Sequence, residues 1–126
     1  GARGGAQRDG FAADKFVCGT ADGLVVCLDI TGRLFAATRV EGEPTGGGSS
    51  IGLKTLSVDG RGLVWGGCDD DSVRVWSLEK GFLKALLSRE HVHDDQVTAL
   101  AVSSDGGVLV TGGGGGEVKV WAVECR

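Results

Sequence analysis

The stretch that decides the fold runs from Val92 to Trp121 and reads VHDDQVTALAVSSDGGVLVTGGGGGEVKVW. It contains three apolar runs, at residues 97–102, 108–111 and 117–121, which short turns rich in Ser, Asp and Gly separate. Because connections this short join neighbouring strands only in opposite directions, the stretch predicts a three-stranded antiparallel meander.

The stretch resembles a WD40 repeat. That pattern is a Gly-His pair, an apolar strand, Ser-Pro-Asp-Gly, a second strand, a turn with an Asp, and a strand that ends in Trp-Asp. His93, Asp105, Thr111 and Trp121 match it in register. The resemblance implies a buried hydrogen-bonded network of His, turn Asp, Ser or Thr, and Trp. Since Gly115 stands in place of the turn Asp, we expect the network here to lack its carboxylate.

A similar segment precedes this one and ends at Trp76, 45 residues before Trp121. This interval is within the roughly 40–45 residues that are typical of the repeat. The alignment places Asp59 opposite Asp105, and this segment carries the turn carboxylate as Asp70. Two matching segments in one register indicate a repeated structural unit.

The chain divides at its glycine-rich connections. We expect an earlier, partial repeat with Cys27 at the Trp position, and an outer strand at Phe82–Leu87, although that spacing also fits one face of a helix. The predicted organisation is a linker or frayed entry at 1–13, a partial first blade at 14–40, a loop at 41–50, a second blade at 51–88, and a third blade without its outer strand at 89–126.

The fold class predicted from these repeats is all-β: a segment of a WD40-like β-propeller with antiparallel four-stranded blades. A blade buries one face against each neighbour, so two or three alone leave apolar faces exposed. The chain is therefore expected to be either a segment of a larger propeller or a partner to other copies. The sequence contains no Met, which favours the segment, with the remaining blades of the same propeller as its neighbours.

Composition excludes several classes of function. The net charge of −4, with acidic and basic residues interspersed, gives no electrostatic reason to expect nucleic acid as a partner. No apolar run approaches the ~18 residues of a membrane span, so we expect no membrane partner. The four cysteines form no CxxC pair, and we interpret them as reduced thiols of an intracellular protein.

Three short motifs suggest chemistry, and each has a simpler explanation. The run His91–Asp95 begins like the HxHxD of zinc hydrolases, but Gln96 follows where a further His is needed. The run Asp69–Asp71 lacks the alternating ligands of a calcium loop, so Asp70 is expected to bond backbone N–H groups, with Asp69 and Asp71 solvated. Gly112–Gly116 lacks the Lys of a phosphate loop. We therefore predict no catalytic, cofactor-binding or metal-binding residues.

The family resemblance implies a non-enzymatic scaffold for protein-protein interaction. We expect the rim loops Glu41–Ser50 and Ser88–Gln96 to contact other proteins, since loops on a rigid frame vary freely. A ciliary, flagellar or centriolar assembly in the cytoplasm is one setting. The alternatives are a soluble adaptor in signalling, RNA processing or ubiquitin transfer, and a quinoprotein-like enzyme, which only Gly19–Asp29 suggests.

Overall fold

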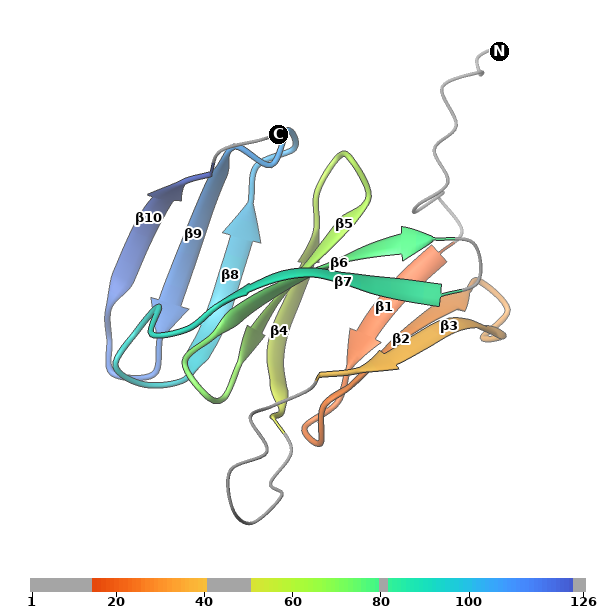
Figure 1. The fold of residues 1–126 in the computed structure, drawn as a ribbon, viewed down its shortest axis with the longest axis horizontal. Helices are drawn as coiled ribbons and strands as arrows, with labels where there is room; N and C mark the ends of the chain where they lie inside the picture. The colour runs from red at the N-terminus through yellow and green to blue at the C-terminus, as the bar shows by residue number, and fades with distance from the viewer. Residues whose placement is uncertain (1–14, 41–50, 80–81, 124–126) are drawn as a thin grey trace.

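The computed structural model describes residues 15–40, 51–79 and 82–123. These residues form three antiparallel sheets that stand side by side, with the second sheet in the middle (Figure 1). The first sheet consists of β1 (Lys15–Gly19), β2 (Leu24–Asp29) and β3 (Leu34–Arg39). The second consists of β4 (Leu53–Val58), β5 (Leu63–Cys68), β6 (Val73–Glu79) and β7 (Phe82–Arg89), and the third of β8 (Val97–Val102), β9 (Val108–Gly113) and β10 (Val118–Ala122).

The predicted all-β class and antiparallel sheets are confirmed. Residues 82–89 form a strand that pairs with β6 from Glu79↔Phe82 to Val73↔Arg89, so the helical alternative is wrong there. Without β7, the outer edge of β6 would have no hydrogen-bond partner in the second sheet. Within the described residues no helix is long and apolar enough to cross a membrane. The predicted linker 1–13 and loop 41–50 lie outside those residues, and the blade boundaries stay predictions.

Two strands continue through glycines that follow their apolar residues. β5 continues to Cys68 through Gly66 and Gly67, and β9 continues through Gly112 to Gly113. A Cβ added at Gly66 would lie 2.8 Å from the Trp76 ring, and one at Gly67 would lie 2.7 Å from Val97 Cγ1. Neither distance leaves room for a side chain, so glycine at both positions lets the adjacent side chains approach the backbone of β5.

The strand register corrects one sequence alignment. Phe16 pairs with Leu28 just as Val64 pairs with Trp76 and Leu109 pairs with Trp121. Leu28, and not Cys27 as predicted, therefore occupies the Trp position of the first sheet. Cys27 is fully buried and points into the core between the first and second sheets, as its position one residue away on an alternating strand requires.

The core consists of two apolar layers, one on each side of the second sheet. Val64 and Trp76 pack toward the first sheet, with Val25 and Cys27 opposite them. The layer toward the third sheet contains Trp65, Val73, Val75, Val97 and Leu109. Because side chains alternate along a strand, β5 and β6 contribute to both layers and join the three sheets into one body.

Trp76→Ala should lower the free energy of unfolding by about 3–5 kcal/mol, because the indole is only 2% exposed and its removal leaves a cavity between two sheets. Urea unfolding at one fixed protein concentration measures this loss. The matched control is Leu87→Ala on β7, whose side chain is 55% exposed, and it should change the stability by about 0.5 kcal/mol or less. Equal losses in the two variants would contradict the two-layer core.

Candidate functional site

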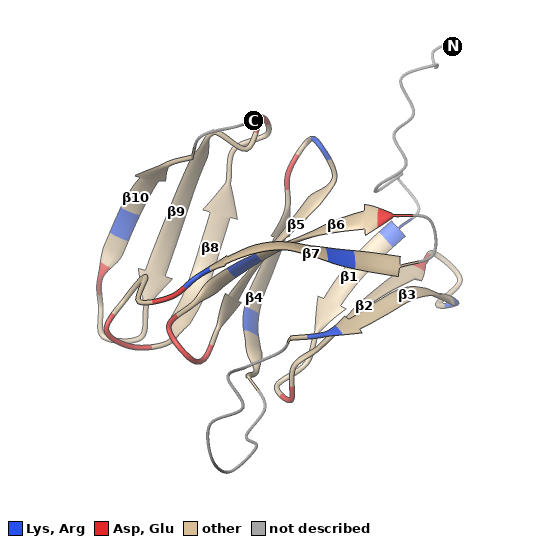
Figure 2. Ribbon diagram, in the orientation of Figure 1, with Lys and Arg blue, Asp and Glu red and all other residues tan. Residues whose placement is uncertain are grey.

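One rim of the structure is formed by three connections, which we call the acidic rim. They are the β5–β6 turn (69–72), the β7–β8 loop (90–96) and the β9–β10 turn (114–117). Figure 2 shows acidic residues gathered at this end of the second and third sheets. Seven carboxylates belong to these connections, on Asp69, Asp70, Asp71, Glu90, Asp94, Asp95 and Glu117.

The β7–β8 loop is held against the β5–β6 turn by Asp71. The carbonyl oxygen of Asp71 accepts the Val92 N–H at 3.0 Å, and its Oδ1 accepts the His91 N–H at 3.0 Å. Both Asp71 and His91 adopt positive φ angles, 70° and 60°, so the backbone turns sharply in both connections where they meet. Asp71 was expected only to be solvated, and it instead fixes the conformation of the predicted contact loop 88–96.

The carboxylates of Asp69 and Asp70, in the same turn, also accept backbone N–H groups. Asp70 Oδ1 accepts the Ser72 N–H at 3.2 Å, the backbone bond that the sequence predicted for it, and also the Ser72 hydroxyl at 2.5 Å. Asp69 Oδ1 accepts the Gly52 N–H at 3.1 Å, which ties the turn to the segment that enters β4. Asp69 was expected only to be solvated. It is exposed, but its carboxylate also accepts a backbone hydrogen bond.

His93 is the centre of a buried network in the third sheet. Its ring is 1% exposed, with Nε2 at 2.8 Å from Thr111 Oγ1 and Nδ1 at 2.9 Å from Glu117 Oε1. The Trp121 indole N–H donates to the same Thr111 oxygen at 3.0 Å. An ionised carboxylate only accepts, so Nδ1 carries a proton, and in the neutral ring Nε2 then accepts from Thr111.

The network is therefore complete, and the prediction that it lacks a carboxylate is wrong. Glu117 supplies the carboxylate from a position two residues after Gly115, because its longer side chain reaches back to the imidazole. The hydrogen bond with His93 is the main reason that the pKa of Glu117 lies below its ordinary value. The sequence signal that could have revealed this is an acidic residue at the end of the glycine-rich turn.

On the opposite rim, Asp59 and Asp105, which the sequence alignment placed opposite each other, occupy different positions. Asp59 N–H donates to the Leu63 carbonyl as Ser103 N–H donates to that of Val108, at 3.0 and 2.8 Å. Asp59 Oδ1 and Ser103 Oγ each accept the N–H of that same residue, Leu63 or Val108. Asp59 therefore corresponds to Ser103 and not to Asp105, because the β8–β9 turn is one residue longer.

Asp59 is a buried carboxylate with charged and neutral donors around it. Its Oδ2 accepts the Trp65 indole N–H at 3.0 Å and an Arg61 guanidinium N–H at 2.9 Å. Burial alone would raise the pKa of Asp59, but the bonds from Trp65, Arg61 and two backbone N–H groups together lower it. Asp105 is exposed, and its pKa is lowered by the Gly107 N–H and the Ser103 hydroxyl.

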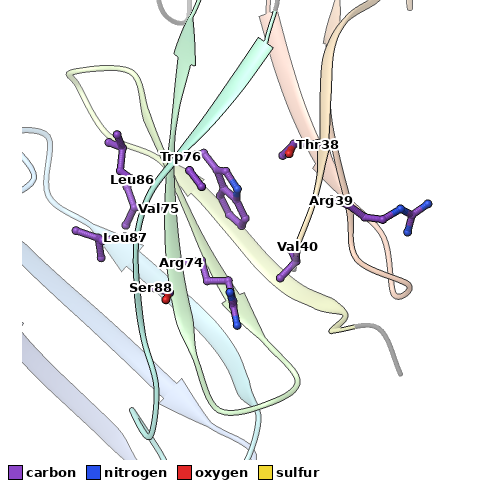
Figure 3. A pocket seen from close by; sticks show the side chains of 10 residues that line it. Thr38, Arg39, Val40, Arg74, Val75, Trp76, Leu86, Leu87 and Ser88 are labelled. Carbon is purple, nitrogen blue, oxygen red and sulfur yellow. The ribbon is translucent and has the colours of Figure 1, made fainter. Parts of the chain in front are cut away.

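A hollow of about 360 Å³ lies between the first and second sheets, at the outer strands β3 and β7 (Figure 3). Figure 3 shows Thr38, Val40 and Trp76 on its walls, whereas the Arg39 side chain points away from it. Arg74 faces the same space, and its Nε donates to Ser72 Oγ at 3.3 Å. The lining of the hollow includes the hydroxyls of Thr38 and Ser88 but no His, Asp, Glu or Lys that could act as a general base toward them.

No metal site is formed by the residues that the structure describes. Among them, no three His, Cys, Asp or Glu side chains are grouped so that they could hold an ion. His91 is exposed, with its Nδ1 3.3 Å from Asp71, whereas His93 points inward to Thr111 and Glu117. The two imidazoles thus have separate partners.

Comparison with known proteins agrees with this geometry. Residues 85–122 match the family described as WD domain, G-beta repeat. The C-terminal WD40 domain of Sif2 superposes on 93% of this chain with a TM-score of 0.70, at 18% identity and over 33% of its own length. A chain of the mitotic checkpoint complex does so over 91% of this chain and 35% of its own, with a TM-score of 0.71 at 18% identity. Residues 85–122 therefore match a WD40 repeat, and the described residues fold like a segment of a WD40 propeller domain.

Curated relatives share part of the sequence. Cilia- and flagella-associated protein 52 of Mus musculus is 37% identical over 70 residues, and that of Sus scrofa is 39% identical over 67. These matches cover 54% and 52% of this chain, but only 10% of each relative. A guanine nucleotide-binding protein subunit beta-like protein of Encephalitozoon cuniculi is 32% identical over 79 residues, 60% of this chain and 24% of its own.

Asp59→Ala should lower the free energy of unfolding by about 2–4 kcal/mol, because it leaves a buried indole N–H and a partly exposed guanidinium without their acceptor. Urea unfolding followed by tryptophan fluorescence measures this change. Asp105→Ala is the matched variant and should cost clearly less, since its carboxylate is exposed. A larger loss in Asp105→Ala would contradict the greater contribution of the buried Asp59 carboxylate.

Glu117→Gln should lower the stability at neutral pH and flatten its acid dependence. The pKa of Glu117 is lower in the folded than in the unfolded chain, so its contribution is fully present above the unfolded value of about 4.3 and is lost as pH falls through the folded value. Urea midpoints between about pH 3 and 7 should therefore differ most at the neutral end. Glu117→Asp keeps the charge with a shorter reach, and wild-type behaviour in that variant would argue against the contact with His93.

Proposed function

We propose that this chain is part of a non-catalytic WD40 scaffold that binds other proteins through its acidic rim. WD40 propellers generally bind other proteins. The observation that carries the proposal for this rim is the pinning of the β7–β8 loop, in which Val92 and His93 are buried while Asp94 and Asp95 are exposed. A loop whose backbone is fixed presents its exposed side chains with little loss of entropy on binding.

The charge of this rim favours a partner segment that is basic. Asp94 and Asp95 are exposed next to Glu90, and they extend from the loop that Asp71 holds in place. The amine of Lys119 donates to the Val92 carbonyl at 2.9 Å and thereby holds the base of the same loop. Complementary charge steers association and selects among partners more than it adds affinity.

A ciliary or flagellar assembly is the setting that we propose for the scaffold. It is supported by the relatives named cilia- and flagella-associated protein 52, whose similarity covers about half of this chain. The second candidate is a soluble adaptor, supported by the similarity to a guanine nucleotide-binding protein subunit beta-like protein. The two candidates predict different locations. A ciliary scaffold stays with the axoneme, whereas a soluble adaptor is found in the soluble fraction of the cell.

The test is detergent extraction of cilia from cells that carry the tagged protein. We expect the protein to stay with the axoneme, and Asp94→Arg with Asp95→Arg to release it, because reversed charges repel a basic partner. Glu79→Arg, a single charge reversal at the other end of β6 and away from the acidic rim, is the control and should be retained. Recovery of the unchanged protein only in the soluble cell fraction would argue for the adaptor.

A further inference from the structure

Trp76 is the one tryptophan whose indole N–H has no hydrogen-bond acceptor among the residues that the structure describes. The indole N–H of Trp65 donates to Asp59 Oδ2 and that of Trp121 donates to Thr111 Oγ1, both at 3.0 Å. Trp76 is only 2% exposed. Because a buried N–H without a partner is costly, an acceptor placed beside this indole would stabilise it.

The strand register explains why Trp76 lacks the acceptor that Trp121 has. Thr111 pairs with the residue two positions before Trp121, and Gly66 pairs with the residue two positions before Trp76. Glycine therefore occupies in the second sheet the position of the Thr111 hydroxyl. A Cβ added at Gly66 would lie 2.8 Å from Trp76 Cζ3, so the benzene edge of this indole faces β5. Nε1 lies on the opposite edge of the ring and points away from β5, toward the outer strands.

The Trp76 ring lines the hollow of about 360 Å³ between the first and second sheets. Figure 3 shows this ring and the Arg74 guanidinium on the same side of β6, facing Thr38 and Val40. The two side chains share a face because Arg74 precedes Trp76 by two residues on one strand. Arg74 Nη2 is 3.5 Å from Asp70 Oδ2, which is long for a charge-assisted bond. The hollow thus has an N–H donor and a positive charge on the same wall.

The strands that border the hollow favour an acidic partner. β3 reads LFAATR and β7 reads FLKALLSR, so both contain basic residues and neither contains Asp or Glu. Among the described strands, each of the two pairs on one side only and forms the outer strand of its sheet. A segment of another protein can approach the hollow from that side, and the basic strands steer an acidic segment toward it.

We propose that the hollow binds the carboxylate of an Asp or Glu side chain from an acidic segment of a partner protein, with the Trp76 indole N–H and the Arg74 guanidinium as donors. An ionised carboxylate only accepts hydrogen bonds, and its two oxygens can serve both donors. The volume of the hollow is at the small end for ligand pockets and suits a side chain. This contact is separate from the acidic rim and does not depend on the basic partner proposed there.

The indole N–H resonances of the three tryptophans test this site. The probe is a blocked peptide of alternating Glu and Gly, which in an extended conformation places its carboxylates on one side. Added to the 126-residue chain, it should shift the Trp76 resonance. The resonances of Trp65 and Trp121 should stay in place, because these indoles already have acceptors. The signal that disappears in Trp76→Phe identifies the Trp76 resonance.

The same peptide with Gln in place of Glu is the control for charge and should leave all three resonances unchanged. No shift with the Glu peptide would overturn the proposal and indicate that solvent alone occupies the hollow. An equal shift with the Gln peptide would overturn the choice of a carboxylate. An equal shift with sodium acetate, at the same concentration of carboxylate, would overturn the choice of a protein segment in favour of a small acid.

Two substitutions test the two donors separately. Trp76→Phe removes the N–H and keeps an aromatic ring, and Arg74→Gln removes the charge. Each should weaken binding of the labelled Glu peptide, measured by fluorescence anisotropy, by about tenfold or more. Lys54→Gln on β4, at the opposite edge of the sheet, removes the same charge and should change binding by about twofold or less. Unchanged binding in either donor variant would overturn the proposal, provided that its Trp65 and Trp121 resonances show it to be folded.

Discussion

The packing of one sheet face against the next is the constraint on which the rest of the structure depends. Three or four short strands cannot bury enough apolar surface by themselves, so each sheet requires a neighbour. The second sheet satisfies this need twice, with Trp76 and Val64 on one side and Trp65 and Val75 on the other. The alternation of side chains along β5 and β6 is therefore what makes three small sheets one folded unit.

Close packing of these faces depends on the precise ends of the strands, and polar side chains fix those ends. Asp59, Asp70 and Ser103 each accept backbone N–H groups within their own turn, which satisfies donors that the ladder leaves unpaired. Across the sheets, Gly60 N–H donates to the Ser104 carbonyl at 2.7 Å and joins two neighbouring turns. Turn chemistry and sheet packing thus reinforce each other.

The features that sequence could predict are those that repeat. Trp76 and Trp121, 45 residues apart, gave the strand order and the antiparallel class, because strand period and turn spacing are local properties. One error came where a turn changes length. The β8–β9 turn is one residue longer than the β4–β5 turn, which shifted Asp59 from its true counterpart Ser103 to Asp105. A gap of one residue in a polar turn leaves no trace in the apolar pattern.

Glu117 shows why a site can keep its chemistry when its sequence signature is lost. The buried imidazole of His93 needs an acceptor at Nδ1, because an unpaired buried donor is costly, but it does not matter which backbone position supplies the oxygen. A Cβ added at Gly113 would lie 2.8 Å from His93 Cγ, so glycine at that position leaves room for the imidazole, and the side chain of Glu117 reaches its Nδ1 at 2.9 Å. The physical requirement is a carboxylate at hydrogen-bond distance, and a motif written as positions in a sequence describes only one way to meet it.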